Sequence, residues 1–249
     1  MKLVKWEKLP QELQTEEVRR YYDILQKRKT GLFFKRVFDL VLSLVGLIFC
    51  SPIFLILAIA IKIDSPGPVF YRQERVTQYG KRFRIHKFRT MIQDADKGSQ
   101  LTVNHDSRVT CVGKVIRGCK LDEIAQLIDV FQGTMTFVGV RPESPKYVAA
   151  YSQEMMATLL LPAGITSLAS IYYKDEAKLL DGVENVDQVY IEKILPDKML
   201  YNLKELERHS FWHDIKIMFM TVLAVLVKEY KNNSDGAENL KSIETTGKN

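Results

Sequence analysis

The sequence is poor in cysteine, and the cysteines that it has show no pattern of a bonded or metal-binding site. Cys50, Cys111 and Cys119 include no CxxC spacing, and their number is odd. A disulfide framework needs cysteines in even number, and a cysteine zinc site needs closely spaced pairs. The sequence therefore argues against both and favours a reducing, cytosolic environment.

Several signatures of common enzyme and targeting classes are also missing. The chain contains no Walker loop, no GxGxxG motif and no GxSxG motif. Its N-terminal segment is dense in charge and has no apolar core, so it is not a cleavable signal peptide. Acidic residues are in deficit, since 36 lysines and arginines face 30 aspartates and glutamates, for a net charge of +6. Such a balance suits an anionic partner: nucleic acid, an anionic membrane surface or a phosphate-rich substrate.

What the sequence does have is one long run without charge. The segment from Leu40 to Ile61 reads LVLSLVGLIFCSPIFLILAIAI. As a helix it would be about 30 Å long, which matches the hydrocarbon core of a bilayer. Helices of soluble proteins are seldom apolar on every face over such a length. We therefore predict a membrane helix.

Ser51 and Pro52 divide this run into two arms of similar length. Proline removes a backbone donor and leaves the carbonyl of Ile48 without its helical partner. In lipid that carbonyl still needs a donor, and the Ser51 hydroxyl or a neighbouring element could supply one. We predict a break in the helix at this point.

Both flanks of the run are basic. Lys35 and Arg36 precede it, and the residues that follow it include Lys62, Arg72, Arg75, Lys81, Arg82, Arg84, Lys87 and Arg89. Because positive charge stays preferentially on the cytoplasmic side, a helix that dips in and returns satisfies both flanks. We favour this re-entrant helix over a kinked helix that spans the membrane, and the sequence leaves both open.

The remaining patterns divide the chain into five parts. We expect a charged cytosolic leader (1–34), the membrane helix (35–63), a catalytic domain (64–205), a helix that lies on the membrane interface or packs on the core (206–231) and a disordered tail (232–249). A short strand is predicted around Phe83 to Lys87 from its alternation. A helix is predicted from the apolar spacing that starts at Leu121, and Gly133 should end it.

Two adjacent carboxylates, Asp122 and Glu123, fall in the first turn of that helix. Acidic residues there commonly do no more than complement the helix dipole. However, Arg117 and Lys120 lie just before them, and free N–H groups at a helix start favour anions. Carboxylates amid excess cations next to a membrane helix suggest Mg²⁺ with a diphosphate. An ionised aspartate can also act as a nucleophile.

A second acidic motif is much weaker. Asp94-Ala95-Asp96 resembles the acid-x-acid signature of some glycosyltransferases that hold a metal and a nucleotide-sugar, but in a polar loop it is more simply explained as a solvated loop. Two rival functions therefore stay open. One is a glycosyltransferase that moves only the sugar and releases UDP. The other is a membrane-anchored basic protein that binds nucleic acid or anionic lipid without catalysis.

Several motifs in order resemble one family, the bacterial sugar transferases, which are small monotopic phosphoglycosyl transferases. The matching stretches are KRVFDLVLS (35–43), the Ser51-Pro52 break, SPGPVFYRQERV (65–76), FRIHKFRTM (83–91), DSRVT (106–110) with Gly113, LDEIAQL (121–127), GTMTFVGVRPE (133–143) and PAGITSLAS (162–170). The resemblance covers the chain except for its leader and tail.

The resemblance implies a reaction. Such enzymes move a phosphosugar from a UDP-sugar to undecaprenyl (polyprenyl) phosphate and release UMP, at the cytosolic face of the bacterial inner membrane. By analogy, Asp122 would be the nucleophile that forms a covalent phosphosugar intermediate, and Glu123 would help to place Mg²⁺ or manage protons. Phosphate and nucleotide binding would fall to Lys87, Arg89, Arg117, Arg141 and Pro142. Inner-membrane lipids and downstream glycosyltransferases are candidate partners, and nucleic acid is not.

The implied fold is a mixed, helix-rich α/β domain on the membrane, with the Ser-Pro-broken re-entrant helix and C-terminal interfacial helices. The sequence departs from the family pattern at Thr77, Ala125, Asp129, Val140, Ser167 and Ser170. These departures leave the dyad and the basic residues intact, and they concern the loops expected near the donor. The sequence does not identify the sugar, the glycan pathway or the oligomeric state.

Overall fold

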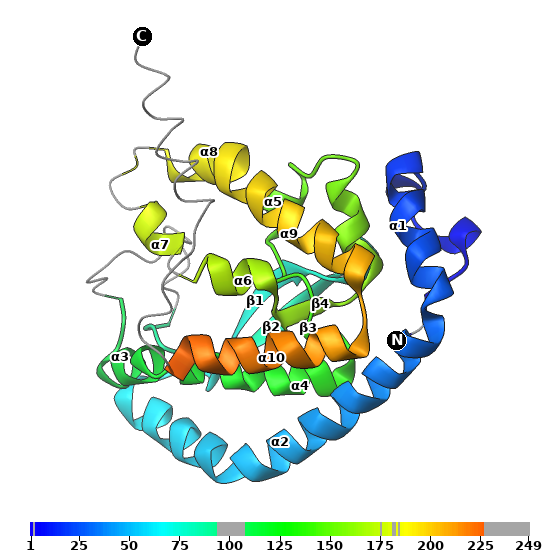
Figure 1. Cartoon of the computed structure of the whole chain (residues 1–249). Helices are drawn as coiled ribbons and strands as arrows, with labels where there is room; N and C mark the ends of the chain where they lie inside the picture. The colour runs from blue at the N-terminus through cyan, green and yellow to red at the C-terminus, as the bar shows by residue number, and fades with distance from the viewer. Residues whose placement is uncertain (2, 94–107, 175, 181–182, 184, 227–249) are drawn as a thin grey trace.

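The computed structural model describes residues 1, 3–93, 108–174, 176–180, 183 and 185–226. Over these residues the chain is a helix-rich α/β protein in which four strands form two separate two-stranded sheets. The Asp94-Ala95-Asp96 motif and the predicted tail at 232–249 lie outside the described residues. Figure 1 shows the helices arranged around the strands, with one long helix along the lower edge.

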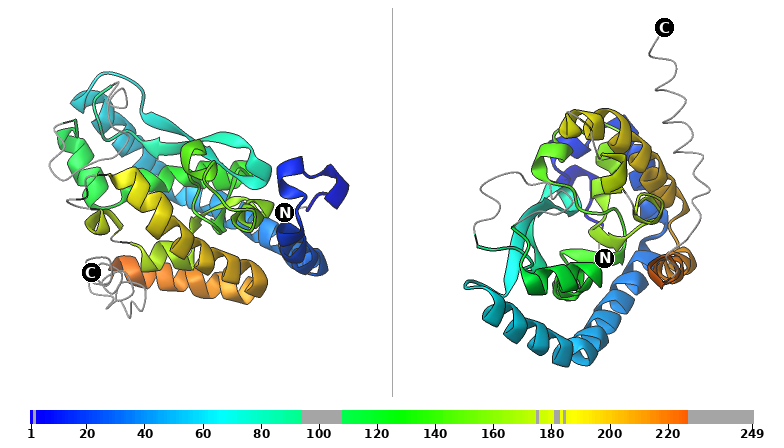
Figure 2. Two further views of the ribbon diagram at one scale, coloured as in Figure 1. Left: turned by 90° about the horizontal axis from the view of Figure 1, so that it is seen from above. Right: turned by 90° about the vertical axis from the view of Figure 1, so that its left-hand side faces the viewer.

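That long helix, α2 (Lys29–Asp64), is a single bent helix with Pro52 inside it. Figure 2 shows its two arms meeting at a bend, with the rest of the protein on the inner side of the angle. The Ser51 hydroxyl donates to the carbonyl of Ile48 at 2.7 Å, which is the partner that the sequence suggested. The helix begins at Lys29 rather than at the predicted residue 35.

The length and composition of α2 are sufficient for a membrane-crossing helix, with a mean hydropathy of 2.8 over its most apolar window. Large apolar side chains such as Ile48, Phe49 and Ile56 are exposed around the bend. Exposed apolar surface of this extent is unusual on a soluble protein. The helix is therefore compatible with association with a membrane.

Polar contacts fasten the first arm of α2 to the domain. Arg36 donates to the carbonyls of Val130 (2.7 Å) and Phe131 (2.9 Å), near the end of helix α4 (Gln126–Gln132). Asp39 accepts a hydrogen bond of 2.6 Å from the Thr136 hydroxyl on strand β3 (Met135–Val138).

The second arm of α2 returns to the same domain. Leu57 and Ile61 belong to a buried cluster with Phe88, Ile116 and Ala125. At the helix end, Asp64 accepts from the backbone N–H of Val112 at 3.0 Å, in the first turn of helix α3 (Cys111–Gly118). Both arms therefore contact the segment from α3 to α4.

The strand predicted at 83–87 lies within β2 (Arg82–Phe88), which pairs antiparallel with β1 (Phe70–Val76). Tyr79 and Gly80, both at positive φ, form the turn between them. Strand alternation places Arg75 and Lys87 on one face of this hairpin. Strand β3 pairs in parallel with β4 (Ala163–Thr166).

The helix predicted from Leu121 forms in two parts, the 3₁₀ segment η5 (Leu121–Ala125) and then α4, and it ends at Gly133 (φ 88°) as expected. Asp129 of α4 ties this helix to the hairpin. Its carboxylate accepts from the His86 backbone N–H and contacts the His86 ring nitrogen, both at 2.8 Å. The other helical segments are η1 (Trp6–Lys8), η2 (Gln11–Leu13), α1 (Glu16–Lys27), η3 (Gln78–Gly80), α5 (Pro145–Val148), η6 (Met155–Leu160), α6 (Leu168–Tyr172), α7 (Glu176–Leu179), α8 (Val186–Val189), η7 (Tyr190–Ile194), α9 (Leu195–Arg208) and α10 (Phe211–Leu226).

Residues 1–34, which the sequence predicts as a charged cytosolic leader, pack against the rest of the protein. The apolar face of α1 carries Val18, Tyr21, Tyr22 and Leu25 at helical spacing, and it is buried. These side chains share one hydrophobic cluster with residues of η6 and α9, among them Leu159, Leu160, Leu203 and Leu206. The dense charge of this segment lies on its outer face, so the segment is part of the folded domain.

The segment predicted as an interfacial or core-packed helix, 206–231, contains helix α10, and its residues 227–231 lie outside the described part of the chain. Helix α9 ends at Arg208 and α10 begins at Phe211, where the Ser210 hydroxyl accepts from the backbone N–H of His213 at 3.2 Å. Ile217 of α10 packs on the core with Val138 and Ile171. Trp212 and Phe219 stay exposed, at 78% and 65%.

The packing of α1 predicts a stability effect. Leu25→Ala should lower the free energy of unfolding by about 2–5 kcal/mol, because Leu25 is fully buried and its removal leaves a cavity. Gln26→Ala, on the exposed side of the same helix, is the matched control and should be close to neutral. Denaturant unfolding of the protein in lipid nanodiscs measures both. Equal stabilities for the two variants would mean that α1 is not part of the core.

Candidate active site

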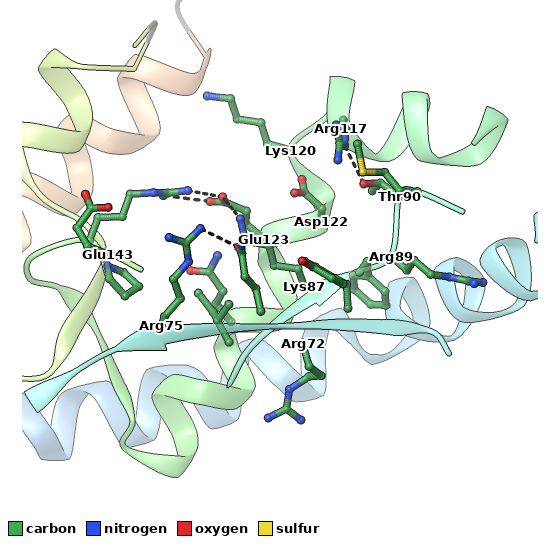
Figure 3. A pocket seen from close by; sticks show the side chains of 18 of the residues that line it. Arg72, Arg75, Lys87, Arg89, Thr90, Arg117, Lys120, Asp122, Glu123 and Glu143 are labelled. Atoms are coloured by element: carbon green, nitrogen blue, oxygen red, sulfur yellow. Dashed lines mark hydrogen bonds and ion pairs between the residues drawn. The ribbon is translucent and has the colours of Figure 1, made fainter. Parts of the chain in front are cut away.

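A pocket of about 1030 Å³ opens between the β1–β2 hairpin, segment η5 and the loop that follows β3. Asp122, Glu123, Lys87, Arg117 and Arg141 all line it. Residues that are far apart in the sequence thus meet at one place, as Figure 3 shows for those that it labels. A further group from α7, η7 and α9 lines its other end, namely Glu176, Tyr190 and Lys198.

The two carboxylates of the dyad have different surroundings. Glu123 contacts Lys87 at 3.2 Å and Arg141 at 2.5 Å through Oε1, and its Oε2 lies 3.4 Å from the Arg141 guanidinium. Burial alone would raise the pKa of Glu123, but Arg141 and Lys87 outweigh burial and hold this pKa well below its usual range. Glu123 is therefore ionised at any physiological pH, and both of its oxygens are engaged by cations.

Asp122 lies beside this ion pair, and no other side chain among the described residues forms a hydrogen bond or ion pair with its carboxylate. Burial and the neighbouring charge of Glu123 raise the pKa of Asp122 above its ordinary value. Lys87 and Arg117 act in the opposite direction. A carboxylate that faces a pocket without a partner is available to react with a ligand or to bind a metal ion.

Local geometry explains why the dyad faces the pocket. Lys120, in the left-handed conformation (φ 54°), lies between the end of α3 and the start of η5, so the chain turns sharply just before the dyad. Arg117 donates from Nε to the Thr90 hydroxyl at 2.7 Å. This bond orients the guanidinium at the pocket and uses only one of its N–H groups.

Arg89, for which the family resemblance implies phosphate or nucleotide binding, also lines the pocket and has protein partners there. Its guanidinium donates to the carbonyls of Ser65 (2.8 Å) and Pro66, and the residue is only 5% exposed. Figure 3 shows its side chain directed away from Asp122 and Glu123. Gly67 (φ 121°) permits this contact, since a Cβ there would lie 2.3 Å from the guanidinium. Arg89 thus fastens the chain just after the end of α2, and its role in phosphate binding stays a prediction.

Some pocket residues were not singled out from the sequence. Arg75 points into the pocket, whereas Arg72 points to the opposite side of the same strand (Figure 3). Strand alternation could have identified Arg75. Glu143 follows Arg141 and Pro142 in the pocket-lining loop, and it contacts Tyr190 and Lys198. No short-range pattern connects these last two residues to the dyad.

Three departures from the family pattern have structural uses here. The Thr77 hydroxyl donates to the carbonyl of Thr134 (2.7 Å) and accepts from the N–H of Ala163 (3.1 Å), so it joins the hairpin to the β3–β4 sheet. Asp129 holds His86, and Ser167 caps α6 by accepting from the N–H of Ser170. These positions support the pocket from behind.

A metal ion bound here would need further coordinating atoms from a substrate. The described residues contain no group of three or more His, Cys, Asp or Glu side chains arranged to hold a metal ion. Mg²⁺, however, is commonly held by one or two carboxylates together with substrate phosphates. Asp122 is a free carboxylate, and Glu123 lies next to it, so the dyad fits that kind of shared site.

Comparisons with known proteins agree with this arrangement. The family described as bacterial sugar transferase matches residues 30–228. A protein of Aeromonas hydrophila named UDP-N-acetylgalactosamine-undecaprenyl-phosphate N-acetylgalactosaminephosphotransferase is 33% identical over 198 residues, which are 78% of this chain and 44% of the relative. A Klebsiella pneumoniae UDP-glucose:undecaprenyl-phosphate glucose-1-phosphate transferase is 36% identical, over 77% of this chain and 40% of the relative.

A third relative, from Caulobacter vibrioides, is named UDP-glucose:undecaprenyl-phosphate glucose-1-phosphate transferase and is 32% identical over 206 residues, with 70% of its length covered. The chain spans less than half the length of the first two relatives. The family match, by contrast, covers most of the present chain, including both arms of α2 and every residue of the pocket. This chain belongs to the bacterial sugar transferase family.

Proposed function

We propose that the protein transfers a phosphosugar from a UDP-sugar to undecaprenyl phosphate or a similar polyprenyl phosphate. The products are the polyprenyl-diphosphate-sugar and UMP. The observation that carries the proposal is the contrast within the dyad. Glu123 is neutralised by Lys87 and Arg141, whereas Asp122 faces the same cationic pocket without a side-chain partner among the residues that the structure describes. The names of the relatives support the same donor and acceptor classes.

The chemistry has two displacements at one phosphorus. An Asp122 carboxylate oxygen attacks the β-phosphorus, the bond from this phosphorus to the bridging oxygen breaks, and UMP leaves with that oxygen and its electrons. A phosphate oxygen of the lipid then attacks the same phosphorus and releases the Asp122 carboxylate. Because the two anionic substrates react in turn, a single pocket can serve both.

The basic residues and the dyad share the charge of the diphosphate. Lys87, Arg117 and Arg141 are suited to bind phosphate oxygens, and Arg141 offers a planar guanidinium that can do so through two N–H groups. Asp122 and Glu123 would hold Mg²⁺ together with the diphosphate. Such an ion would neutralise the charge that develops on the leaving phosphate.

The location follows from α2. Both ends of this helix contact the domain, and the exposed apolar residues lie around its bend. A re-entrant helix in the inner leaflet would leave both ends and the whole domain in the cytosol. Exposed Trp212 and Phe219 of α10 support an interfacial position for that helix. We therefore propose the cytosolic face of the bacterial inner membrane, with its lipids as partners.

The reaction is tested by the nucleotide that leaves. Purified full-length protein in nanodiscs, given Mg²⁺, undecaprenyl phosphate and a panel of UDP-sugars, should release UMP with one donor. Asp122→Asn should lower this rate by at least about a thousandfold, because it removes the nucleophile. Asp23→Asn, an equal change on the exposed face of α1, is the control and should keep the wild-type rate.

Three other results of that assay would contradict the proposal or the role given to Asp122. UDP as the product would indicate a glycosyltransferase that moves only the sugar. Absence of any nucleotide from folded protein with every donor would favour a binding protein without catalysis. Release of UMP at the wild-type rate by Asp122→Asn would remove Asp122 from the role of nucleophile.

The electrostatics of the dyad predict a pH effect. Asp122 must be ionised to attack, and its raised pKa means that the rate falls as the pH drops through this pKa. Glu123→Gln removes a neighbouring negative charge, so the pKa of Asp122 should fall and the acid limb of kcat/KM should move to lower pH. The rate itself should also fall, since Lys87 and Arg141 lose their partner. A rate profile measured across the acid range checks this, and an acid limb that stays in place or moves to higher pH contradicts it.

The topology of α2 is tested by labelling. In a background of Cys50→Ala, Cys111→Ser and Cys119→Ser, the single variants Lys27→Cys and Lys62→Cys place a thiol at each exposed flank of the helix. In intact cells neither thiol should react with an impermeant maleimide, and both should react after the inner membrane is permeabilised. Reaction of either one from outside would show that α2 spans the membrane.

A further inference from the structure

A second cluster of charged groups lines the pocket beyond the dyad. Lys198 on α9 is buried, and its ammonium lies 2.7 Å from a Glu176 carboxylate oxygen, 2.9 Å from the Tyr190 hydroxyl and 3.5 Å from a Glu143 carboxylate oxygen. The Tyr190 hydroxyl in turn donates to the same Glu143 oxygen at 2.6 Å. Three separate segments, the loop after β3, α7 and the η7–α9 helix, therefore meet at one lysine.

The hydrogen-bonding capacity of this cluster is already used. A lysine ammonium has three N–H donors, and each has a partner here. Burial and the charge of Glu143 raise the pKa of Tyr190 well above its usual range, so the phenol keeps the proton that it donates. Neither Lys198 nor Tyr190 has a donor left for a ligand. The cluster is thus suited to hold other protein groups in place.

The group that it holds most directly is the loop that carries Arg141. The carbonyl of Val140 accepts from the N–H of Gly164 at 2.8 Å, and the carbonyl of Glu143 accepts from the N–H of Val76 at 3.0 Å. Arg141 lies between these two anchors, next to Pro142, whose ring restricts the backbone. The Glu143 side chain adds a third anchor through Tyr190 and Lys198.

This anchor also affects the dyad, because Glu143 and Glu176 carry negative charges near Arg141. Glu143 and Glu176 are close enough to Arg141 to raise the pKa of its guanidinium, although Glu123 is the larger cause. Without a cation between them, the buried carboxylate of Glu143 and the half-buried carboxylate of Glu176 would compete with Glu123 for the Arg141 guanidinium. An unpaired buried carboxylate is costly, so it would move toward the nearest cation or take up a proton.

We propose that Lys198 and Tyr190 are positioning residues, which engage Glu143 and Glu176 and so keep the Arg141 guanidinium beside Glu123 and free to receive the donor diphosphate. The inference rests on the proposed function, in which Arg141 binds that diphosphate. In this proposal Lys198 of α9 and Tyr190 of η7 contribute to donor binding although neither contacts the donor.

The test uses UDP as the probe, because UDP carries the diphosphate and its binding does not depend on which sugar is the natural one. Full-length protein in nanodiscs is titrated with UDP and Mg²⁺ by calorimetry. Lys198→Met should raise the Kd of UDP by about tenfold, since a misplaced binding group commonly costs this much or more. Lys193→Met, an exposed lysine of η7, is the matched control and should bind UDP as the wild type does.

A double-mutant cycle separates positioning from a merely structural role. Arg141→Ala should itself weaken UDP binding, and adding Lys198→Met to it should then change the Kd by less than about twofold. Adding Glu143→Gln to Lys198→Met should recover part of the lost affinity, because it removes a competing carboxylate. Tyr190→Phe keeps all the charges and should have a smaller effect in the same direction. It also serves as the test if Lys198→Met does not fold.

The outcomes distinguish the inference from the function on which it rests. If Lys198→Met raises the Kd of UDP tenfold in the Arg141→Ala background as well as in the wild type, that result overturns the positioning role and leaves the proposed function intact. Unchanged UDP binding in Lys198→Met, with Tyr190→Phe also unchanged, overturns it as well. Unchanged UDP binding in Arg141→Ala overturns the proposed role of Arg141 in donor binding, and the inference with it.

Discussion

The bent helix α2 is the constraint on which the rest of the structure depends. An apolar helix of this length must find a non-aqueous environment around its bend, yet both of its ends carry polar groups that need partners. The structure supplies those partners from one segment of the domain. Arg36 binds carbonyls at the end of α4, and Asp64 accepts from an N–H at the start of α3. The dyad lies between these two attachments. The position of the active-site candidates relative to the bend is thus set by the helix itself.

The two adjacent carboxylates of the site, Asp122 and Glu123, have different surroundings. Two like charges beside each other in a partly buried pocket are unfavourable unless cations compensate them. Here Lys87 and Arg141 pair with Glu123, and Asp122 keeps a raised pKa and a carboxylate without an ion pair to any described residue. The same pattern explains the excess of basic residues around the dyad. They neutralise one carboxylate and leave positive charge for an anionic ligand.

Much of the fold was accessible from local patterns. The charge-free run predicted α2, the Ser51 hydroxyl was a candidate partner for Ile48, and Gly133 marked the end of the helix that carries the dyad. The packing of residues 1–34 was less accessible, because their charges dominate the sequence while the buried face shows only as the spacing of Val18, Tyr21, Tyr22 and Leu25. Which surface covers that face cannot be known before η6 and α9 are placed. The hydrogen bonds of Arg89 were inaccessible for a similar reason, since its carbonyl partners lie just after the end of α2.

The sequence by itself determined the long apolar helix with its proline, the strand that holds Lys87, and the pair of carboxylates at a helix start. Each of these follows from spacing over a few residues, and local backbone geometry makes such spacing informative. Only the tertiary structure decided which cations reach Glu123, that Asp122 stays free, and that Lys198 and Tyr190 contact Glu143. These contacts join residues from distant parts of the chain. Their geometry depends on how the helices pack, and no local pattern encodes it.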